Sequence, residues 1–388
     1  MKRVMYIFLS VLIYSISACQ NYDEPEPGTR TKRTVIVYMA AENTLSWFFA
    51  RDTLEMTKAA AYVPDDVNFV IYLDGPKYPT ICTLTAKEGK KTWKEYRKDI
   101  DSADSTNMLN TIKEIANAFP AEHYGLVLWS HATGWVNRKE AKRRNTILVD
   151  NNCNSSASNI GSEMNISELR WVLENFKHLD YIFFDACFMQ SIEVAYELRK
   201  VTDYIVGSPA EIPGEGAPYE MIMTALCNGD AKEIANQYYE GYKDGDGVVL
   251  SVIDCSKLEA LAKKTAQYVP TVWANKAELN TSGIQYYVPF ITWNSHHPEP
   301  FDMNSAMHKL LPEDMYEEWR PYLDAAVPFR KATPWWFSVL YHASLTDPDY
   351  FSGISMFIPQ SKYEPYGWDA QFQTTQWYAA AGWKQTGW

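Results

Sequence analysis

The chain has 388 residues, a formal net charge of −12 and 46% hydrophobic residues. Its acidic balance disfavours nucleic acid as a partner, because phosphate groups would be repelled. It would attract a cationic substrate, but it is only a weak indication of one. A chain of this length and composition can bury one large core or two moderate ones, and beyond its N-terminal segment it has no apolar run long enough to span a membrane.

The first predicted element is an export signal at residues 1–18. Two basic residues precede the apolar run 4–16, which is too short to hold the chain in a bilayer. The run leads into Ser17-Ala18-Cys19, which resembles the bacterial lipobox, where removal of the signal leaves a cysteine with acyl chains at the new N-terminus. We therefore expect a lipid on Cys19. The alternative is an ordinary signal peptide followed by a chance cysteine.

Residues 19–33 are predicted to form a flexible spacer, because they are polar, contain proline and cannot bury enough apolar area to fold. Asp23 and Glu24 resemble the tag that sends some lipoproteins of the Bacteroides group to the outer cell surface. We expect the protein to be exported, attached to the outer membrane through its lipid alone, and either surface-exposed or periplasmic.

The remaining cysteines predict no disulfide framework, because they are scattered, lack a CxxC pair and are odd in number once Cys19 carries a lipid. At least one thiol must therefore stay free or pair between chains. The cysteines other than Cys19 are Cys82, Cys153, Cys187, Cys227 and Cys255.

From residue 34 onward, short apolar runs alternate with helical periodicity. The runs predict buried parallel strands at 34–39, 67–75, 124–130, 181–187, 203–208 and 247–254. The helical patterns predict helices at 105–119, 167–176, 188–199, 231–242 and 256–268, with Ser167 and Ser256 as N-caps. Segment 80–97 is predicted to be a hairpin at the sheet edge. This order predicts an α/β fold with an open sheet covered on both faces.

After about residue 270 the alternation weakens, and proline and tryptophan become frequent. We predict a main α/β domain at 34–270 and a C-terminal subdomain at 271–388 that packs on it. Segment 351–363 indicates a further pair of strands. We expect the tryptophans of this region to pack in the core rather than to form a platform for peptide or sugar.

Two reactive side chains directly follow apolar runs. His131 comes after the run 124–130, and Cys187 ends the run 181–187. In an open α/β sheet, reactive groups gather beyond the carboxyl ends of the strands, and an imidazole near a thiol can remove its proton to give a nucleophilic thiolate. Each residue alone is more often structural, but their shared context favours a catalytic base and nucleophile.

The segments around these residues resemble the signature segments of the clostripain peptidases, which are relatives of caspases, legumain and gingipains. They read LVLWSHATGW at 126–135 and YIFFDACFMQSIEVAYELR at 181–199. The resemblance extends to 37–45, 207–219 and 352–359, so it covers most of the chain after the spacer.

This resemblance implies a caspase-like three-layer α/β/α sandwich with a mostly parallel central sheet. It also implies a cysteine endopeptidase with a His131–Cys187 dyad that cleaves protein or peptide substrates after arginine or lysine. The oxyanion would be held by the backbone N–H groups of Ala132 and Cys187. Ala132 stands where the family usually has glycine, so either the loop tolerates a β-carbon or activity is reduced.

Asp185 lies two residues before Cys187 and should point to the same side of the strand. The family uses an acid here to bind the basic P1 side chain, and a carboxylate can hold a guanidinium by two parallel hydrogen bonds. Glu215, or else Glu211, would supply a second acid. The alternative for Asp185 is the N-cap of the helix predicted at 188–199.

A basic stretch at 138–144 interrupts the acidic chain between the two catalytic candidates. Family members often cut themselves in this region, as zymogens do. We therefore predict self-cleavage after Lys142, Arg143 or Arg144, against the alternative of a solvated charge cluster.

No cofactor or metal site is predicted. His296, His297, Asp302 and His308 match no common zinc spacing, and 244–247 begins like a calcium loop but lacks the later ligands, which indicates a turn. Some clostripain-type enzymes require calcium, but no ligand set can be assigned. The family's Asp-Asn pair near the first strand is Glu42-Asn43 here, and we assign it no role.

Two other functions stay open. The first is a non-catalytic surface lipoprotein that uses the peptidase fold to bind peptide or glycan, which Ala132 favours. The second is a peptidase with a different P1 preference, which Asp185 argues against.

Overall fold

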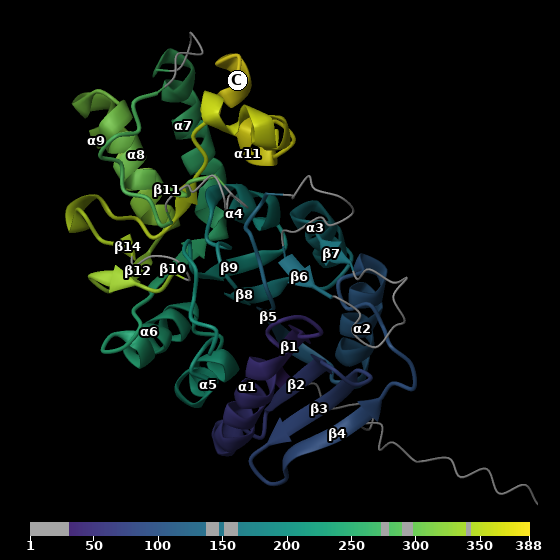
Figure 1. The fold of residues 1–388 in the computed structure, drawn as a ribbon. Helices are drawn as coiled ribbons and strands as arrows, with labels where there is room; N and C mark the ends of the chain where they lie inside the picture. Colours follow the sequence, from purple (N-terminus) through teal and green to yellow (C-terminus); the bar gives the residue numbers. More distant parts are fainter. Residues whose placement is uncertain (1–30, 137–146, 151–161, 273–278, 289–297, 339–342) are drawn as a thin grey trace, which may run out of the picture.

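The computed structural model describes residues 31–136, 147–150, 162–272, 279–288, 298–338 and 343–388 (Figure 1). Within these residues, nine strands form one central sheet in the order β12-β10-β9-β8-β5-β1-β2-β3-β4. In chain order, the strands of this sheet are β1 (Thr31–Ala40), β2 (Val67–Asp74), β3 (Thr80–Thr85), β4 (Gly89–Glu95), β5 (Ala121–Trp129), β8 (Leu179–Asp185), β9 (Thr202–Gly207), β10 (Val249–Asp254) and β12 (Phe329–Ala332).

The middle of the sheet is parallel and its edges are antiparallel. Strands β2, β1, β5, β8 and β9 run in the same direction. At one edge β3 and β4 form the hairpin that the sequence predicts, and at the other β10 and β12 pair antiparallel. The α/β fold with a parallel centre is therefore confirmed, but the sheet as a whole is mixed. The run 247–254, predicted as a parallel strand, forms β10, which pairs antiparallel with both β9 and β12.

Alternate side chains of the central strands belong to two separate cores, one on each face. On β1, Val35 and Val37 face a core shared with α1 (Ser46–Lys58), α5 (Tyr219–Asn228) and α6 (Ala231–Tyr242). Ile36 and Tyr38 face the other core. Helices that contribute to this core include α2 (Ser105–Ala118), α3 (Ile166–Glu174), α4 (Ile192–Leu198), α7 (Leu258–Val272), α9 (Glu313–Ala326) and α11 (Gln376–Ala380). Figure 1 shows helices on both sides of the sheet, which confirms the three-layer arrangement.

Three helix starts differ from the prediction. The helix expected from residue 188 begins at Ile192, because the Ser191 side chain caps it by accepting a hydrogen bond from the Val194 amide. Asn165, not Ser167, caps α3. The predicted cap Ser256 lies inside a short 3-10 turn, Cys255–Lys257, which Asp254 caps.

The C-terminal region contributes to the same sheet and core. Strand β12 extends the sheet beside β10, and β11 (Phe301–Asp302) pairs with β15 (Ser355–Met356), which is shorter than the strands expected at 351–363. Trp377 and Trp383 are fully buried in the core that contains α4 and α7, so they are packing residues. The remaining helices here are α8 (Met303–Leu310) and α10 (Trp368–Phe372). None of the described helices is both long and apolar enough to cross a membrane.

Candidate active site

His131 and Cys187 follow the ends of two neighbouring strands, at the same edge of the sheet. Strands β5 and β8 are parallel, and Trp129 is paired with Asp185 in their register. Each candidate residue lies two positions beyond its member of this pair. The structure therefore brings the imidazole and the thiol to one rim at the carboxyl ends of the strands, as the sequence predicts.

The loops that follow the two residues are in direct contact. Gly134 has a φ of 76° and Phe188 a φ of 62°. A β-carbon on Gly134 would lie only 3.0 Å from the carbonyl oxygen of Phe188, so a glycine is required for this approach. A positive φ is uncommon for phenylalanine, and this strained residue comes directly after Cys187, where strain is often associated with function.

Cys187 is in a resting, protonated form. Its sulfur accepts a hydrogen bond from the Ile212 amide at 3.5 Å. Burial raises the pKa of the Cys187 thiol to about 12; the charges of Glu211 and Asp185 add to the rise, and the Ile212 amide opposes it. The residue keeps partial exposure at the surface. At neutral pH the thiol therefore needs a base before it can act as a nucleophile.

The His131 ring is held by the loop after β1. Its Nε2 atom lies 2.7 Å from the hydroxyl oxygen of Thr44. This contact fixes the orientation of an imidazole that is itself only partly buried.

Asn43 ties this loop to its neighbours. Its amide donates hydrogen bonds to the carbonyl oxygens of Ala40 at 2.9 Å and Val149 at 2.7 Å, and its oxygen accepts one from the Leu45 amide at 2.8 Å. Asn43 is almost fully buried. The sequence assigns no role to Asn43, and the structure gives it one in holding the loop that carries Thr44.

Ala132 is compatible with the loop that contains it. Its backbone bridges to Ile147, and its φ is not in the left-handed region, where in the described chain only Leu148 and Phe188 lie among non-glycine residues. A β-carbon at this position is therefore not a source of backbone strain.

Asp185 is buried and does not cap α4, so that alternative is wrong. One of its oxygens, Oδ2, accepts hydrogen bonds from the Ala217 amide at 3.1 Å and the Tyr219 hydroxyl at 2.9 Å. Burial raises the pKa of Asp185 to about 6, although these two hydrogen bonds lower it. The carboxyl group therefore becomes charged only near neutral pH.

A second buried acid, Asp52 of α1, lies beside Asp185. It accepts a hydrogen bond from the Trp129 indole at 2.7 Å, and burial, followed by the charge of Asp185, raises the pKa of Asp52 to about 9. A β-carbon on Gly216 would lie 2.9 Å from Asp185 Oδ2 and 3.1 Å from Asp52 Oδ2, so this glycine covers both acids. Within the described chain, Oδ1 of each acid is buried without a hydrogen-bond partner.

The sequence profile of the clostripain family matches residues 37–388. The chain belongs to the clostripain family. A secreted C11 cysteine protease from Bacteroides thetaiotaomicron, solved with an irreversible peptide inhibitor, is 30% identical over 91% of this chain and 99% of that one, with a TM-score of 0.77. An inactive zymogen C11 protease from Parabacteroides distasonis is 26% identical over the same shares, with a TM-score of 0.75. No curated protein matches. The chain is therefore a cysteine peptidase.

The other two acids that the sequence proposes for this clostripain-family peptidase make different contacts. Glu215 precedes Gly216 and forms an ion pair with Arg51 at 3.5 Å, with over a third of its side chain exposed. Glu211 accepts a hydrogen bond from the Ser338 hydroxyl. Glu215 is thus next to the residue that covers the two buried acids.

Several predicted sites of the clostripain-family chain lie outside the residues that the structure describes. They are Cys19, Lys142, Arg143, Arg144, Cys153, His296 and His297. Of the metal candidates that are described, Asp302 caps α8 and His308 stacks on Tyr350. Residues 243–246 form the expected turn. In the described chain, Cys82, Cys187, Cys227 and Cys255 are free thiols.

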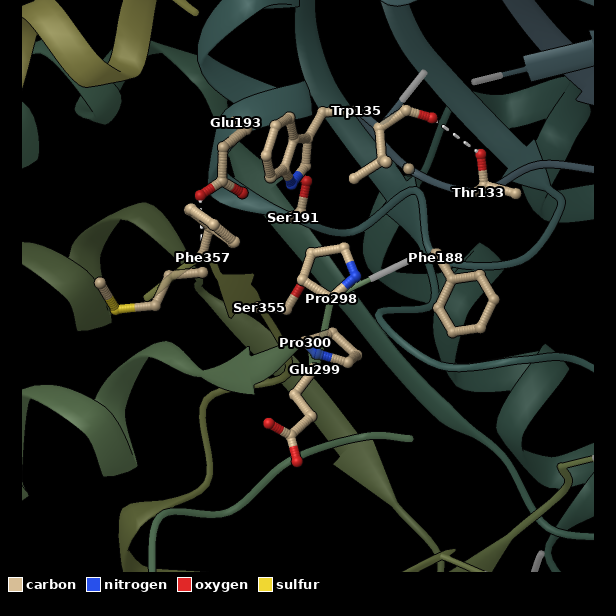
Figure 2. A pocket seen from close by; sticks show the side chains of 13 residues that line it. Thr133, Trp135, Phe188, Ser191, Glu193, Pro298, Glu299, Pro300, Ser355 and Phe357 are labelled. Carbon is tan, nitrogen blue, oxygen red and sulfur yellow. Dashed lines mark hydrogen bonds between the residues drawn. The ribbon is translucent and has the colours of Figure 1, made fainter. Parts of the chain in front are cut away.

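A small cavity lies behind the two active-site loops (Figure 2). Its volume of about 20 Å³ is enough for one water molecule. Figure 2 shows Thr133, Phe188 and Glu193 around it, facing Pro298 and Ser355 from the C-terminal region.

This cavity marks where the C-terminal region supports the active site. The Glu193 carboxylate accepts a hydrogen bond from the Phe357 amide at 2.8 Å, and the Ser355 amide donates to the Gln190 carbonyl oxygen at 3.0 Å. Burial raises the pKa of Glu193 to about 7. Neither His131 nor Cys187 lines the cavity, so it serves packing rather than substrate binding.

Proposed function

We propose that this cysteine peptidase is an endopeptidase that cleaves protein or peptide chains after arginine or lysine, with Cys187 as nucleophile and His131 as general base and acid. The observation that carries the proposal is the register of β5 and β8, which delivers both residues to one rim. The contact between Gly134 and Phe188 keeps the two loops together there.

The reaction follows from these groups. His131 takes the Cys187 proton, and the thiolate attacks the scissile carbonyl carbon while the N–H groups of Ala132 and Cys187 stabilise the oxyanion. The imidazolium then protonates the leaving amine as the C–N bond breaks, which leaves a thioester on Cys187. His131 next deprotonates a water molecule that attacks the thioester, and the acid product leaves as the thiol reforms.

The resting contacts must change before this reaction starts. Nε2 of His131 bonds to Thr44, and the thiol holds its proton firmly because burial raises its pKa to about 12. Substrate binding or chain cleavage therefore has to bring an imidazole nitrogen to the sulfur.

The basic P1 preference is supported by the buried acids. Among the residues that the structure describes, one carboxylate oxygen of Asp185 has no hydrogen-bond partner, and a guanidinium or ammonium group would satisfy it. Since Gly216 covers Asp185, the segment 211–217 must shift to admit a side chain. Glu215, or else Glu211, would contribute a second acid from this segment.

Self-cleavage after Lys142, Arg143 or Arg144 is part of the proposal. The structure describes the chain up to Val136, before the basic stretch, and again from Ile147, after it. Ile147 forms a β-bridge with Ala132, next to His131. The described chain that follows the stretch is thus close to the catalytic rim at Ile147. The related zymogen from Parabacteroides distasonis agrees with such a device.

We also propose that the protein is exported and anchored by a lipid on Cys19 to the outer membrane. The secreted relative from Bacteroides thetaiotaomicron supports export. Incorporation of labelled fatty acid into the wild type but not into Cys19→Ala, expressed in its native type of host, tests the anchor.

Hydrolysis of fluorogenic peptides ending in arginine, lysine or asparagine tests the activity. We expect turnover of the arginine and lysine peptides, loss on thiol alkylation, and none in Cys187→Ala. Turnover of the asparagine peptide alone would contradict the P1 assignment. If protein that has been cleaved in the basic stretch hydrolyses none of these peptides, the non-catalytic binding protein is favoured instead.

A further inference from the structure

A larger hollow, which we call the α1 hollow, lies on the face of the sheet that carries α1. It is lined by one side of α1, by the loop that follows β2, and by residues of β3 and β4. Figure 1 shows α1 beside β2 and this hairpin. The volume of the hollow is about 460 Å³, which is within the range of ligand-binding pockets. Among the described residues that line it, none belongs to the proposed mechanism.

Large apolar side chains stand exposed around the α1 hollow. Phe49 of α1 and Tyr78 of the loop line it, and Tyr78 is 54% exposed. Ala50 also lines it and lies three residues after Trp47 and four before Leu54, so these two side chains share its side of the helix. Trp47 is 89% exposed and Leu54 is 55% exposed. A hollow with exposed apolar side chains around it marks an interaction site.

Two lysines give the α1 hollow a positive charge. Lys77 of the loop and Lys90 of β4 both line it, and both are exposed. The chain as a whole is acidic, with a formal net charge of −12, so this basic site contrasts with the rest of the protein. The hollow therefore suits a ligand that is apolar and also carries a negative charge.

The α1 hollow is a direct neighbour of the active site. On α1, Asp52 lies beside Asp185, which is proposed to bind the P1 side chain, while the next residue, Thr53, lines the hollow. The helix begins two residues after Thr44, whose hydroxyl group contacts the ring of His131. One helix thus borders both the proposed P1 site and the hollow, so a peptide bound at the first could extend to the second.

The proposed reaction sets the direction in which a substrate reaches the α1 hollow. His131 protonates the leaving amine, so the residues after the cleaved bond lie on the His131 side of Cys187. Cys187 follows β8 and His131 follows β5. The sheet continues from β5 through β1 to β2, whose end borders the hollow. The leaving part of the substrate is therefore directed toward the hollow.

We propose that the α1 hollow binds the fourth or fifth substrate residue after the cleaved bond, and that it prefers a large apolar side chain with an acidic neighbour. Strand β2 is three steps from β8 in the sheet, which is about 14 Å, and an extended peptide covers this distance with about four residues. The assignment to the leaving side of the substrate rests on the proposed function, whereas the apolar and acidic character of the ligand does not.

The test compares three quenched fluorescent peptides that share a single arginine as the cleavage site. In the first, the fourth and fifth residues after the arginine are phenylalanine and the sixth is aspartate. In the second, alanine replaces both phenylalanines, and in the third the phenylalanine pair stands before the arginine instead. We expect the wild type to cleave the first peptide with a kcat/KM about tenfold or more above that of the second. The third should lack this advantage.

Two variants remove the α1 hollow in different ways. Ala50→Trp fills it, and Tyr78→Ala removes part of its wall. Each should lower the tenfold ratio between the first two peptides to about threefold or less, because the phenylalanines are no longer buried. Ala325→Trp is the matched control, since it makes the same substitution at an exposed alanine of α9, on the opposite face of the sheet, and should keep the ratio. Melting curves establish that each variant folds.

A second measurement does not require turnover. The fragment of the first peptide that follows the arginine is labelled, and its affinity for each protein is measured by fluorescence anisotropy. The inference is overturned, and the proposed function kept, if arginine peptides are cleaved without the expected preference, if the preference follows the pair before the arginine, or if both folded variants retain it. If no peptide is cleaved but the fragment binds and Ala50→Trp abolishes its binding, the ligand of the hollow stands and the proposed function fails. If the protein neither cleaves nor binds, both fail.

Discussion

Trp129 of β5 and Asp185 of β8 are paired in the parallel register, and each is followed after one further residue by a proposed catalytic group. The same pair also organises the acids beneath the rim. The Trp129 indole donates a hydrogen bond to Asp52 at 2.7 Å, and the charge of Asp185 adds to the effect of burial in raising the pKa of Asp52 to about 9. The register of two strands thus fixes both the reacting atoms and the acids proposed to recognise the substrate.

Gly134→Ala should abolish most activity. Alanine would be strained at a φ of 76° and its β-carbon would lie 3.0 Å from the Phe188 carbonyl oxygen, which pushes the His131 and Cys187 loops apart. We expect a loss of about 1–3 kcal/mol of unfolding free energy and a much larger loss of kcat/KM, measured by urea denaturation and peptide hydrolysis. Gly89→Ala is the control, because Gly89 has a φ of 66° with nothing within 4 Å. Equal activity of the two variants would show that the loop contact is unimportant.

Asp185→Asn should reduce kcat/KM for arginine peptides by about a hundredfold, because the charge-assisted hydrogen bonds to the guanidinium are lost. In the wild type the carboxyl is charged only above its pKa of about 6, so KM should fall as the pH rises through 6. Steady-state kinetics between pH 5 and 8 measure both effects. The rate of alkylation by iodoacetamide checks that Cys187 is intact. A KM that is independent of pH and of the substitution would remove Asp185 from the pocket.

Asp52→Asn should change how stability depends on pH. The pKa of Asp52 is raised from 3.8 to about 9, so the folded protein binds a proton that the unfolded chain releases across this window. The stabilising contribution of the protonated group is present below pH 4 and is lost as the pH rises toward 9. The free energy of unfolding of the variant should therefore rise relative to that of the wild type as the pH increases, by up to about 1.4 kcal/mol per pH unit. Parallel stability curves from urea denaturation at pH 5 and pH 8 would contradict the buried pair.

Asn43→Ala should destabilise the loop that holds His131. It removes four hydrogen bonds of a buried side chain, to Ala40, Ser130, Val149 and Leu45, and we expect a loss of about 2–4 kcal/mol in unfolding free energy. Asn175→Ala is the comparison, because the exposed Asn175 amide makes one bond, to the Trp171 carbonyl oxygen. If both variants lose the same small amount, the network around Asn43 does not hold the loop.

The strands could be predicted from the sequence because buried parallel strands are continuous apolar runs, as in residues 34–39 and 181–187. Helix α1 could not, since its apolar pattern is poor: Trp47 and Leu54 are exposed while Asp52 is buried. The sequence pattern predicts that α4 starts at residue 188, which is too early. Ser191, which caps the helix, lies inside the segment 181–199 that resembles the family's signature.

The catalytic candidates follow strands and were therefore predictable, but their buried neighbours were not. Asp52 reaches Asp185 only through the packing of α1 on the sheet. The α1 hollow is lined from α1, the loop after β2, and strands β3 and β4, which only the packing of α1 on the sheet brings together. Contacts of this kind depend on tertiary structure and leave no local pattern.

The most direct test of the His131–Cys187 pair is labelling with a peptidyl chloromethyl ketone that ends in arginine, followed by peptide mapping in a mass spectrometer. The account predicts a single adduct on Cys187, formed at least about a hundredfold more slowly in His131→Ala because the base is missing. An adduct on Cys82, Cys227 or Cys255 in its place, or equal labelling of Cys187 without the imidazole, would contradict it.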